Sequence, residues 1–391
     1  MTTIPVHVEK SCAKHPLLMS ALRPPQVIEI KISREDLFNH ASLMLQDSKI
    51  LGKRTFRQTK KMWLNLSERE GIYLRFTNRN LMARAAARTE DVTDLSKIVG
   101  VGCGLFALTK AFNVNINRFE RFDPTDKTIR RMDFEFYVGK RRYFHEAKGT
   151  TSEKTASSDR GDIKEQMDST SAYCRKNGRS IAGMTGSIVI YKKTGAKDIS
   201  TRVILLDPPA GGDGEATESD ELSAVLNYYR NIYSVTHTDY LNSRRLSIPT
   251  WLSRVIEGIR RGASLPEQAP SNISLTARVH ELGPDESKYE GTIFDRRLAD
   301  QSLRTSLNFD DAATKIPSSY RFVGVAAEVT ERIVSCEWNR LLEFSDPNSL
   351  RTGALSTSIL ASGVMVRDLP GNELWERESR RAFDSLRKAR A

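Results

Sequence analysis

The chain has 391 residues, and its 60 Lys and Arg against 49 Asp and Glu give a formal net charge of +11. Hydrophobic residues make up 39% and charged residues 28%, which excludes a disordered chain and predicts two or three folded domains. The positive charge favours a polyanionic partner such as nucleic acid but does not establish one.

Cysteine usage and hydrophobicity exclude further classes. The four cysteines are far apart, form no CxxC pair and have no histidine at zinc-site spacing, so neither structural zinc nor a disulfide framework is expected. No apolar run matches a secretion signal or a transmembrane segment. We expect a soluble protein without membrane contact, in the cytoplasm, or in the nucleus if the source is a eukaryote.

Residues 1–94 are expected to be a mostly helical N-terminal region. Prolines make residues 1 to about 35 irregular, and from Ser33, a suitable N-cap, helical patterns continue to about residue 94. Four arginines of this region would follow adjacent turns of one helix: Arg75, Arg79, Arg84 and Arg88. They would form either a DNA-binding surface that tracks phosphates or an ordinary solvated face, and the sequence does not separate the two.

Residues 95–210 are predicted to form an α/β core. A buried helix, three strands, a second helix and two further strands are expected in that order, at 95–112, 114–122, 130–139, 141–149, about 162–176, 186–193 and 201–209. A tight Gly139-Lys140 turn joins the second and third strands. The glycines of the GVGCG segment (100–104) are typical of close helix packing. This order predicts a small mixed β-sheet flanked by helices.

Two further segments follow the core. The Gly-rich stretch 211–221 carries only acidic charges and is interpreted as a linker. Residues 222–391 are expected to be a mainly helical C-terminal region, in which no motif indicates a role. The predicted fold is therefore an α/β core with helical N- and C-terminal regions.

The hairpin of the core carries the residues that are candidates for catalysis or metal binding. On the strand 130–139, Asp133 and Glu135 share the face opposite the apolar side chains, where water or a ligand would reach them. On the next strand, Glu146 and Lys148 share a face. Asp133 would lie beside them if the register allows. Two carboxylates can hold a divalent cation such as Mg²⁺ or Mn²⁺, which activates water and neutralises phosphate charge, and a nearby lysine assists.

The spacing of these residues carries a family resemblance. Asp133, followed after 12 residues by Glu146-Ala147-Lys148, resembles the PD-(D/E)xK nuclease superfamily, as does the order of elements around it. The resemblance covers the core only, and Met132 stands where the superfamily often has proline. It implies a restriction-endonuclease-like core in which Asp133, Glu146 and the carbonyl of Ala147 ligate the metal. Lys148 would be the catalytic lysine.

The resemblance also implies an acidic residue from the first core helix, which 95–112 does not contain. The candidates are Glu90, Asp91, Asp94 and Glu120, of which Glu90 is preferred. On the helix after the hairpin, Gln166 is seven residues from Tyr173 and shares its face. Because some members of the superfamily carry Gln and Tyr after the ExK motif, Gln166 is a candidate site residue or DNA contact.

The sequence therefore predicts a Mg²⁺-dependent deoxyribonuclease that serves in restriction, defence, mobile-element or repair pathways. DNA is the expected partner, and a homodimer or a protein partner stays open. An exposed hairpin with ordinary cross-strand ion pairs would give the same pattern of charges. The alternatives are a catalytically inactive nucleic-acid-binding protein with the same fold and a basic protein-interaction or effector protein.

Overall fold

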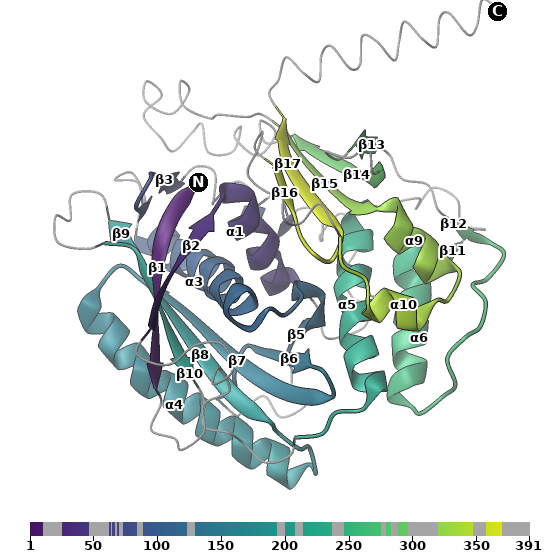
Figure 1. Cartoon of the computed structure of the whole chain (residues 1–391), viewed down its shortest axis with the longest axis horizontal. Helices are drawn as coiled ribbons and strands as arrows, with labels where there is room; N and C mark the ends of the chain where they lie inside the picture. Colours follow the sequence, from purple (N-terminus) through teal and green to yellow (C-terminus); the bar gives the residue numbers. More distant parts are fainter. Residues whose placement is uncertain are drawn as a thin grey trace, which may run out of the picture.

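The computed structural model of the chain contains two main β-sheets and the helices that pack on them (Figure 1). It describes residues 1–10, 26–46, 73–83, 89–122, 130–193, 200–207, 214–236, 246–274, 279–282, 288–295, 320–346 and 357–369, and single positions between 62 and 69.

The larger sheet has seven strands in the order β2-β1-β10-β8-β7-β6-β5. Their bounds are β1 (Thr2–Lys10), β2 (Gln26–Ile32), β5 (Phe119–Arg121), β6 (Phe134–Val138), β7 (Arg141–Thr150), β8 (Gly183–Ile190) and β10 (Arg202–Asp207). The pairs β1–β10 and β7–β8 are parallel, and the other neighbours are antiparallel. The chain is thus a mixed α/β protein, as predicted, and its sheet is larger than expected.

Two long helices pack against this sheet, α3 (Thr89–Phe112) on one face and α4 (Glu153–Lys176) on the other (Figure 1). The observed order α3-β5-β6-β7-α4-β8 confirms the predicted helix, three strands, helix and strand. α4 begins about nine residues earlier than expected, because the Ser152 side chain accepts a hydrogen bond from the Thr155 N–H and caps the helix.

The glycines of α3 bring this helix close to the sheet, as their segment predicted. A Cβ on Gly100 would lie 2.6 Å from the backbone nitrogen of Gly149 on β7. A Cβ on Gly104 would lie 2.2 Å from the Ser187 hydroxyl of β8. α3 is long and apolar enough to cross a membrane by composition, but 72% of its apolar window is buried in the protein. Its apolar character is therefore that of a core helix.

The expectation of a mostly helical N-terminal region is wrong for the part that the structure describes. β1 and β2 form an antiparallel pair at the edge of the larger sheet, and β1 continues it beside β10. Alternate residues Ile4, Val6 and Val8 of β1 are buried, which is the period of a strand. Further on lie α1 (Arg34–Ala41), η2 (Ser42–Leu45) and a three-stranded sheet of β3 (Leu74–Phe76), β4 (Leu81–Ala83) and β9 (Lys192–Lys193).

The C-terminal region was expected to be mainly helical. In the part that the structure describes it combines helices with a five-stranded antiparallel sheet in the order β13-β14-β15-β17-β16. The strands are β13 (Val279–Leu282), β14 (Lys288–Asp295), β15 (Tyr320–Ala326), β16 (Thr357–Ile359) and β17 (Val364–Leu369), with a small pair of β11 (Leu246–Ser247) and β12 (Ile273–Ser274). The helices are α5 (Glu218–Thr236), α6 (Ile248–Arg260), α9 (Ala327–Val334) and α10 (Trp338–Leu342).

The two sheets are held together by helices that contact both. α5 packs against β5 of the larger sheet and against β14 and β15 of the smaller one. α1 packs against α3 and against β16 and β17. At this contact the fully buried Arg321 pairs with Asp368 at 2.6 Å, and its guanidinium lies 4.4 Å from the centre of the Phe38 ring. The C-terminal region is therefore packed onto the core.

The predicted acidic linker, 211–221, is partly an ordered edge of the core. Ala216 donates a backbone hydrogen bond of 2.7 Å to Lys140, and Arg142 donates one of 3.1 Å to Gly214. Asp220, in the first turn of α5, forms an ion pair of 3.0 Å with Arg142. The acidic residues here stabilise the positive end of a helix and bind an arginine, which explains their clustering without a linker.

Candidate active site

The β6–β7 register brings the predicted residues together. Phe134 pairs with His145, so Asp133, one residue before β6, faces Glu146 across the hairpin. The Asp133 carboxylate accepts a long hydrogen bond, 3.5 Å, from the backbone N–H of Ala147. The Lys148 ammonium lies 2.7 Å from Oε1 of Glu146. The hairpin thus gathers Asp133, Glu146, Ala147 and Lys148 in one place.

Two side chains hydrogen-bond to one oxygen of the Glu146 carboxylate, and among the described residues none binds the other. It is only 1% exposed, and its Oε1 accepts hydrogen bonds from Lys148 and from Nε2 of Gln166 on α4, the latter at 2.9 Å. The Gln166 amide also donates to the Arg131 carbonyl at 3.0 Å, which fixes its position. The second oxygen, Oε2, is buried and has no partner among the described residues. Buried carboxylate oxygens are normally paired, so this oxygen requires an explanation.

Burial and mutual repulsion shift the acidity of the two carboxylates. Burial, and then the neighbouring Asp133, raise the pKa of Glu146 to about 7, against the opposing effect of Lys148. Burial also raises the pKa of Asp133, although Lys148 and Arg121 act in the other direction. Lys148 has a raised pKa despite its burial, because Glu146, Asp133 and Asp159 favour its charged form. All three pKa values are raised, and perturbed pKa values gathered in one cleft are typical of functional sites.

A cavity of about 530 Å³ opens at this point between α3 and α4. Its wall includes Asp133, Glu146, Ala147, Lys148 and Gln166, together with Met44, Thr93, Ser96, Lys97, Val101, Arg121, Phe134 and Gly149. Three cations, Lys97, Arg121 and Lys148, therefore surround two carboxylates. The close contact of Gly100 with Gly149 sets α3 directly against the end of β7 and fixes one wall.

The acidic face of the hairpin is more enclosed than predicted. α4 covers it, with Met132, Phe144 and Cys174 packed together, so Met132 lies on this side and not with Phe134. The reason is that β6 begins only at Phe134, and the Met132 N–H instead donates to Thr170 of α4. Glu135, expected to face water, is buried and paired with Arg179 at 2.9 Å. The Asp133–Glu146 end of the face lines one cavity, and Glu135 lines a separate, neighbouring one.

Among the side chains that the structure describes, none of the candidates for the further acidic residue lines this cavity. Glu90 belongs to α3, but its side chain and that of Asp91 lie outside the described residues. Asp94 pairs with Arg69 and Lys97 and does not line the cavity. Glu120 lies on β5 in a neighbouring cavity.

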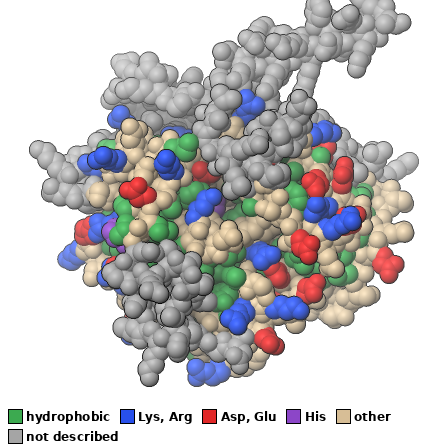
Figure 2. Space-filling model, in the orientation of Figure 1, with side chains coloured by type: hydrophobic (Ala, Val, Ile, Leu, Met, Phe, Trp, Pro, Cys, Tyr) green, Lys and Arg blue, Asp and Glu red, His purple; other side chains and the backbone are tan. Residues whose placement is uncertain are grey.

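The two arginines of the predicted stripe that the structure describes are not on a helix. Arg75 is exposed on β3, and Arg79 is exposed in the turn before β4, while Arg84 and Arg88 lie outside the described residues. The turn forms because Thr77 and Asn80 hydrogen-bond to each other, and Thr201 donates to the Asn80 side chain. On the face shown in Figure 2, Lys and Arg are interspersed with Asp and Glu and form no single basic field.

Several residues that contribute to the site were not predicted. Arg121 ends β5 at the wall of the cavity, and Asp159 on α4 is close enough to Lys148 for each to influence the pKa of the other. Asp159, Ile163 and Gln166 follow helical spacing on the face of α4 toward the sheet, a signal that the sequence carries. Arg121 gave no signal in the sequence, because its place depends on the pairing of β5 with β6.

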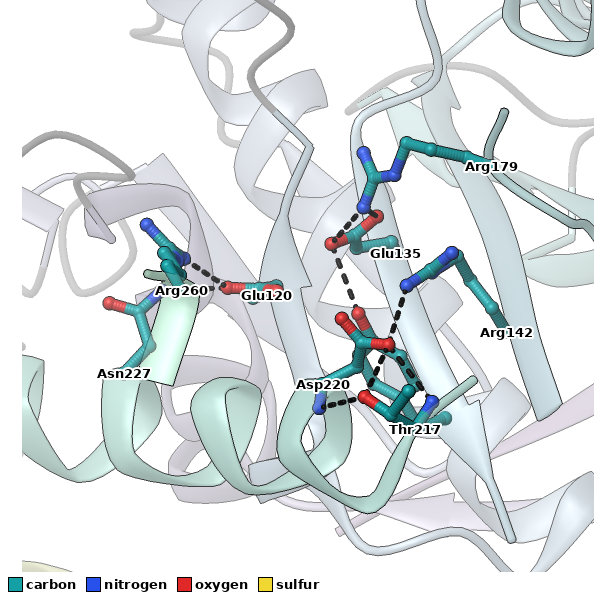
Figure 3. Close-up of polar contacts among 9 residues, drawn as sticks. Glu120, Glu135, Arg142, Arg179, Thr217, Asp220, Asn227 and Arg260 are labelled. Atoms are coloured by element: carbon teal, nitrogen blue, oxygen red, sulfur yellow. Dashed lines mark hydrogen bonds and ion pairs between the residues drawn. The ribbon is translucent and has the colours of Figure 1, made fainter. Parts of the chain in front are cut away.

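A second polar cluster adjoins the site (Figure 3). Glu120 and Glu135 are direct partners on β5 and β6, and both are buried. Arg179 binds both oxygens of Glu135, at 3.2 and 2.9 Å, and Arg260 of α6 lies 3.3 Å from Glu120. Burial, and then the neighbouring Glu135, raise the pKa of Glu120 to about 8.

Comparison with known proteins adds no relative. No protein-family model matches the chain, and neither a curated protein nor a solved structure is similar to it. Among the described residues, no three His, Cys, Asp or Glu side chains are grouped closely enough to hold a metal ion by themselves. The geometry of the cavity between α3 and α4 is therefore the main indication of function.

Proposed function

We propose that the chain is a metal-dependent nuclease with a PD-(D/E)xK centre, which hydrolyses DNA phosphodiester bonds in the cavity between α3 and α4. The observation that carries the proposal is Oε2 of Glu146, a buried oxygen that has no partner in the part of the chain that the structure describes, beside a second carboxylate and a lysine. An ion pair with a purely structural role would satisfy both oxygens, since an unpaired buried charge is costly. This asymmetry favours an active centre over the inactive nucleic-acid-binding alternative.

The arrangement of elements supports the same proposal. In the triplet of the resemblance, Asp133 directly precedes the second strand after α3 and the other two residues lie on the third strand, and the helix that follows supplies Gln166. A restriction-endonuclease-like core is therefore part of the proposal. The strands β1 and β2 would be additions that widen the sheet on the side away from the site.

The donor atoms at the cavity suit Mg²⁺ or Mn²⁺. Carboxylate oxygens of Asp133 and Glu146 are hard ligands, and the carbonyl of Ala147 between Glu146 and Lys148 is of the same kind. A cavity of about 530 Å³ leaves room for an ion that keeps several waters. Two protein carboxylates with water are enough for this cation. When bound, it would activate water and neutralise charge on the phosphate.

The chain's own side chains would then orient and hold the substrate. Gln166 binds Oε1 of Glu146 and so fixes the orientation of that carboxylate. The Lys148 ammonium stays charged beside it and can offset charge that develops on the phosphate or orient the attacking water. Arg121 and Lys97 at the rim provide further positive charge for a phosphate backbone.

A cleavage assay tests this function. Wild type, Glu146→Gln and a control, Glu165→Gln, would be incubated with supercoiled plasmid, linear duplex, single-stranded DNA and RNA in Mg²⁺, Mn²⁺ or EDTA. Glu165 is exposed on α4 and directly precedes Gln166, so it controls for loss of a nearby charge. We expect DNA cleavage by wild type and Glu165→Gln in either metal, and none in EDTA or by Glu146→Gln.

Other outcomes would separate the alternatives. Salt-sensitive DNA binding without cleavage by the wild type would support the inactive nucleic-acid-binding protein. Neither binding nor cleavage would leave the protein-interaction alternative. Cleavage of RNA but not DNA would correct the substrate while keeping the centre.

A further inference from the structure

A second cavity of about 410 Å³ lies beside the candidate active site, between the β5–β6 edge of the sheet and helices α5 and α6. Its wall is made by Glu120, Arg121, Phe122, Glu135, Tyr137, Arg179, Thr217, Ser219, Asp220, Ser223, Ile259 and Arg260. Arg121 lines both this cavity and the one that contains Glu146. The two cavities are therefore neighbours on one surface.

Three arginines from different elements line this cavity. Arg121 ends β5, Arg179 follows α4 and Arg260 ends α6. Arg179 is held by Glu135 and lies 5.6 Å over the Phe122 ring, so its position is fixed. Figure 3 shows Arg179 and Arg260 approaching the adjacent carboxylates Glu135 and Glu120 from opposite sides. Arginine groups fixed in this way are suited to a phosphate, which they can bind through two parallel hydrogen bonds.

The carboxylates of the cavity do not cancel this positive charge. Asp220 is paired at 3.0 Å with Arg142, which is not one of the three arginines that line the cavity. Glu120 is buried next to Glu135, and both effects raise its pKa to about 8, which favours its protonated form beside Arg260. Among the described lining residues, three guanidinium groups then face the charges of Glu135 and the already paired Asp220.

The α5 side of the cavity offers donors. Thr217 caps α5, with its N–H and its hydroxyl both donating to Asp220, and Ser219 lies in the first turn of the helix, so the capped start of α5 forms part of the wall. Ser223, on the next turn, is 5% exposed, and its hydroxyl has no partner among the described residues. A network with a purely structural role would be expected to satisfy this hydroxyl.

We propose that this cavity is a phosphate subsite, which binds a backbone phosphate of the same nucleic-acid strand, next to the phosphate at Glu146. The inference rests on the proposed function. Arg121 lies at the boundary of the two cavities and would contact the strand between them. The subsite would fix the register of the strand, so that one phosphodiester bond is placed at the candidate centre.

Binding to a modified strand tests the proposal. The probe is a short duplex in which single phosphates around the cleavage position are replaced by uncharged methylphosphonates, with affinity measured in the Glu146→Gln background so that the strand stays intact. The variants are Arg260→Ala, Arg260→Lys and the control Arg254→Ala, an exposed residue on the same helix that does not line the cavity. Circular dichroism and urea unfolding confirm that each variant is folded.

We expect Arg260→Ala to weaken binding about tenfold and to reduce the slope of log affinity against log salt by about 1, with Arg260→Lys retaining most of both. One methylphosphonate should weaken binding when Arg260 is present and have no further effect in Arg260→Ala. If Arg260→Ala behaves as Arg254→Ala while the wild type still binds and cleaves, the subsite is refuted and the nuclease stands. If the wild type neither binds nor cleaves DNA, both proposals fail.

Discussion

Replacing Glu146 by Gln should stabilise the metal-free protein at alkaline pH, although it removes the proposed metal ligand. A free glutamate has a pKa of 4.5, and in the folded chain that of Glu146 is about 7. Because the folded state raises the pKa of an acid, it binds more protons than the unfolded state between these values. The free energy of unfolding of the wild type therefore falls as pH rises from about 4.5 through about 7.

The magnitude follows from the two pKa values. The difference between 4.5 and about 7, at about 1.4 kcal/mol for each pH unit, corresponds to about 3 kcal/mol of lost stability above pH 7. Glutamine keeps the hydrogen bond with Gln166 and carries no charge, so Glu146→Gln should be more stable than wild type by up to about this amount at pH 8.5. Near pH 4 the two proteins should be almost equally stable.

Urea unfolding in EDTA, followed by circular dichroism at several pH values, measures this difference, with the exposed Glu165→Gln as control. Adding Mg²⁺ at pH 8.5 should stabilise the wild type but not Glu146→Gln, because the ion binds only the folded site. The reasoning would be refuted if Glu146→Gln were less stable than wild type at pH 8.5, or if the difference did not change with pH. Either result would mean that Oε2 of Glu146 is satisfied in solution.

Three further outcomes are expected. The affinity of the wild type for Mn²⁺ can be followed by the electron paramagnetic resonance of the free ion. The Mn²⁺ concentration at half-saturation should rise about tenfold for each pH unit below about 7, because the ion competes with the proton of Glu146. An affinity that does not change with pH would exclude Glu146 as a ligand. Lys148→Ala should lower the cleavage rate by about 10²-fold or more and leave Mn²⁺ binding as tight or tighter, and weaker Mn²⁺ binding would instead indicate a structural role. Gly100→Ala should destabilise the fold by about 1–3 kcal/mol in urea unfolding, because its Cβ would lie 2.6 Å from β7, whereas Gly161→Ala on α4 has open space and should stabilise it by up to about 1 kcal/mol.

The core was predictable because its signals are local. Strand alternation and the Gly139-Lys140 turn set the hairpin register, and that register alone places Asp133 opposite Glu146. The order of the surrounding helices and strands followed from hydrophobic periods and was confirmed. The placement of Gln166 against Glu146 followed from helical spacing once α4 lay on that face.

The pairing of strands that are far apart in the chain could not be predicted from the sequence. β1 pairs with β10 almost 200 residues away, Val6 with Val203, so its membership of the sheet has no local signal. The spacing of Arg75 and Arg79 predicted a helix, but hydrogen bonds between the Thr77 side chain and the Asn80 backbone form a turn there. The Glu120–Glu135 pair depends on the β5–β6 register, which no short turn specifies.

The most direct test of the proposed centre is the Mg²⁺-dependent cleavage rate of a labelled DNA duplex by wild type and Asp133→Asn. Asp133 is half-buried, and among the described residues its carboxylate accepts one hydrogen bond, the 3.5 Å bond from Ala147, so the isosteric substitution should leave the fold intact. We predict cleavage by wild type that requires Mg²⁺ or Mn²⁺, and a loss of at least about 10²-fold in a folded Asp133→Asn protein. Equal cleavage by the two proteins, or cleavage by wild type in EDTA, would contradict a metal centre at Asp133 and Glu146.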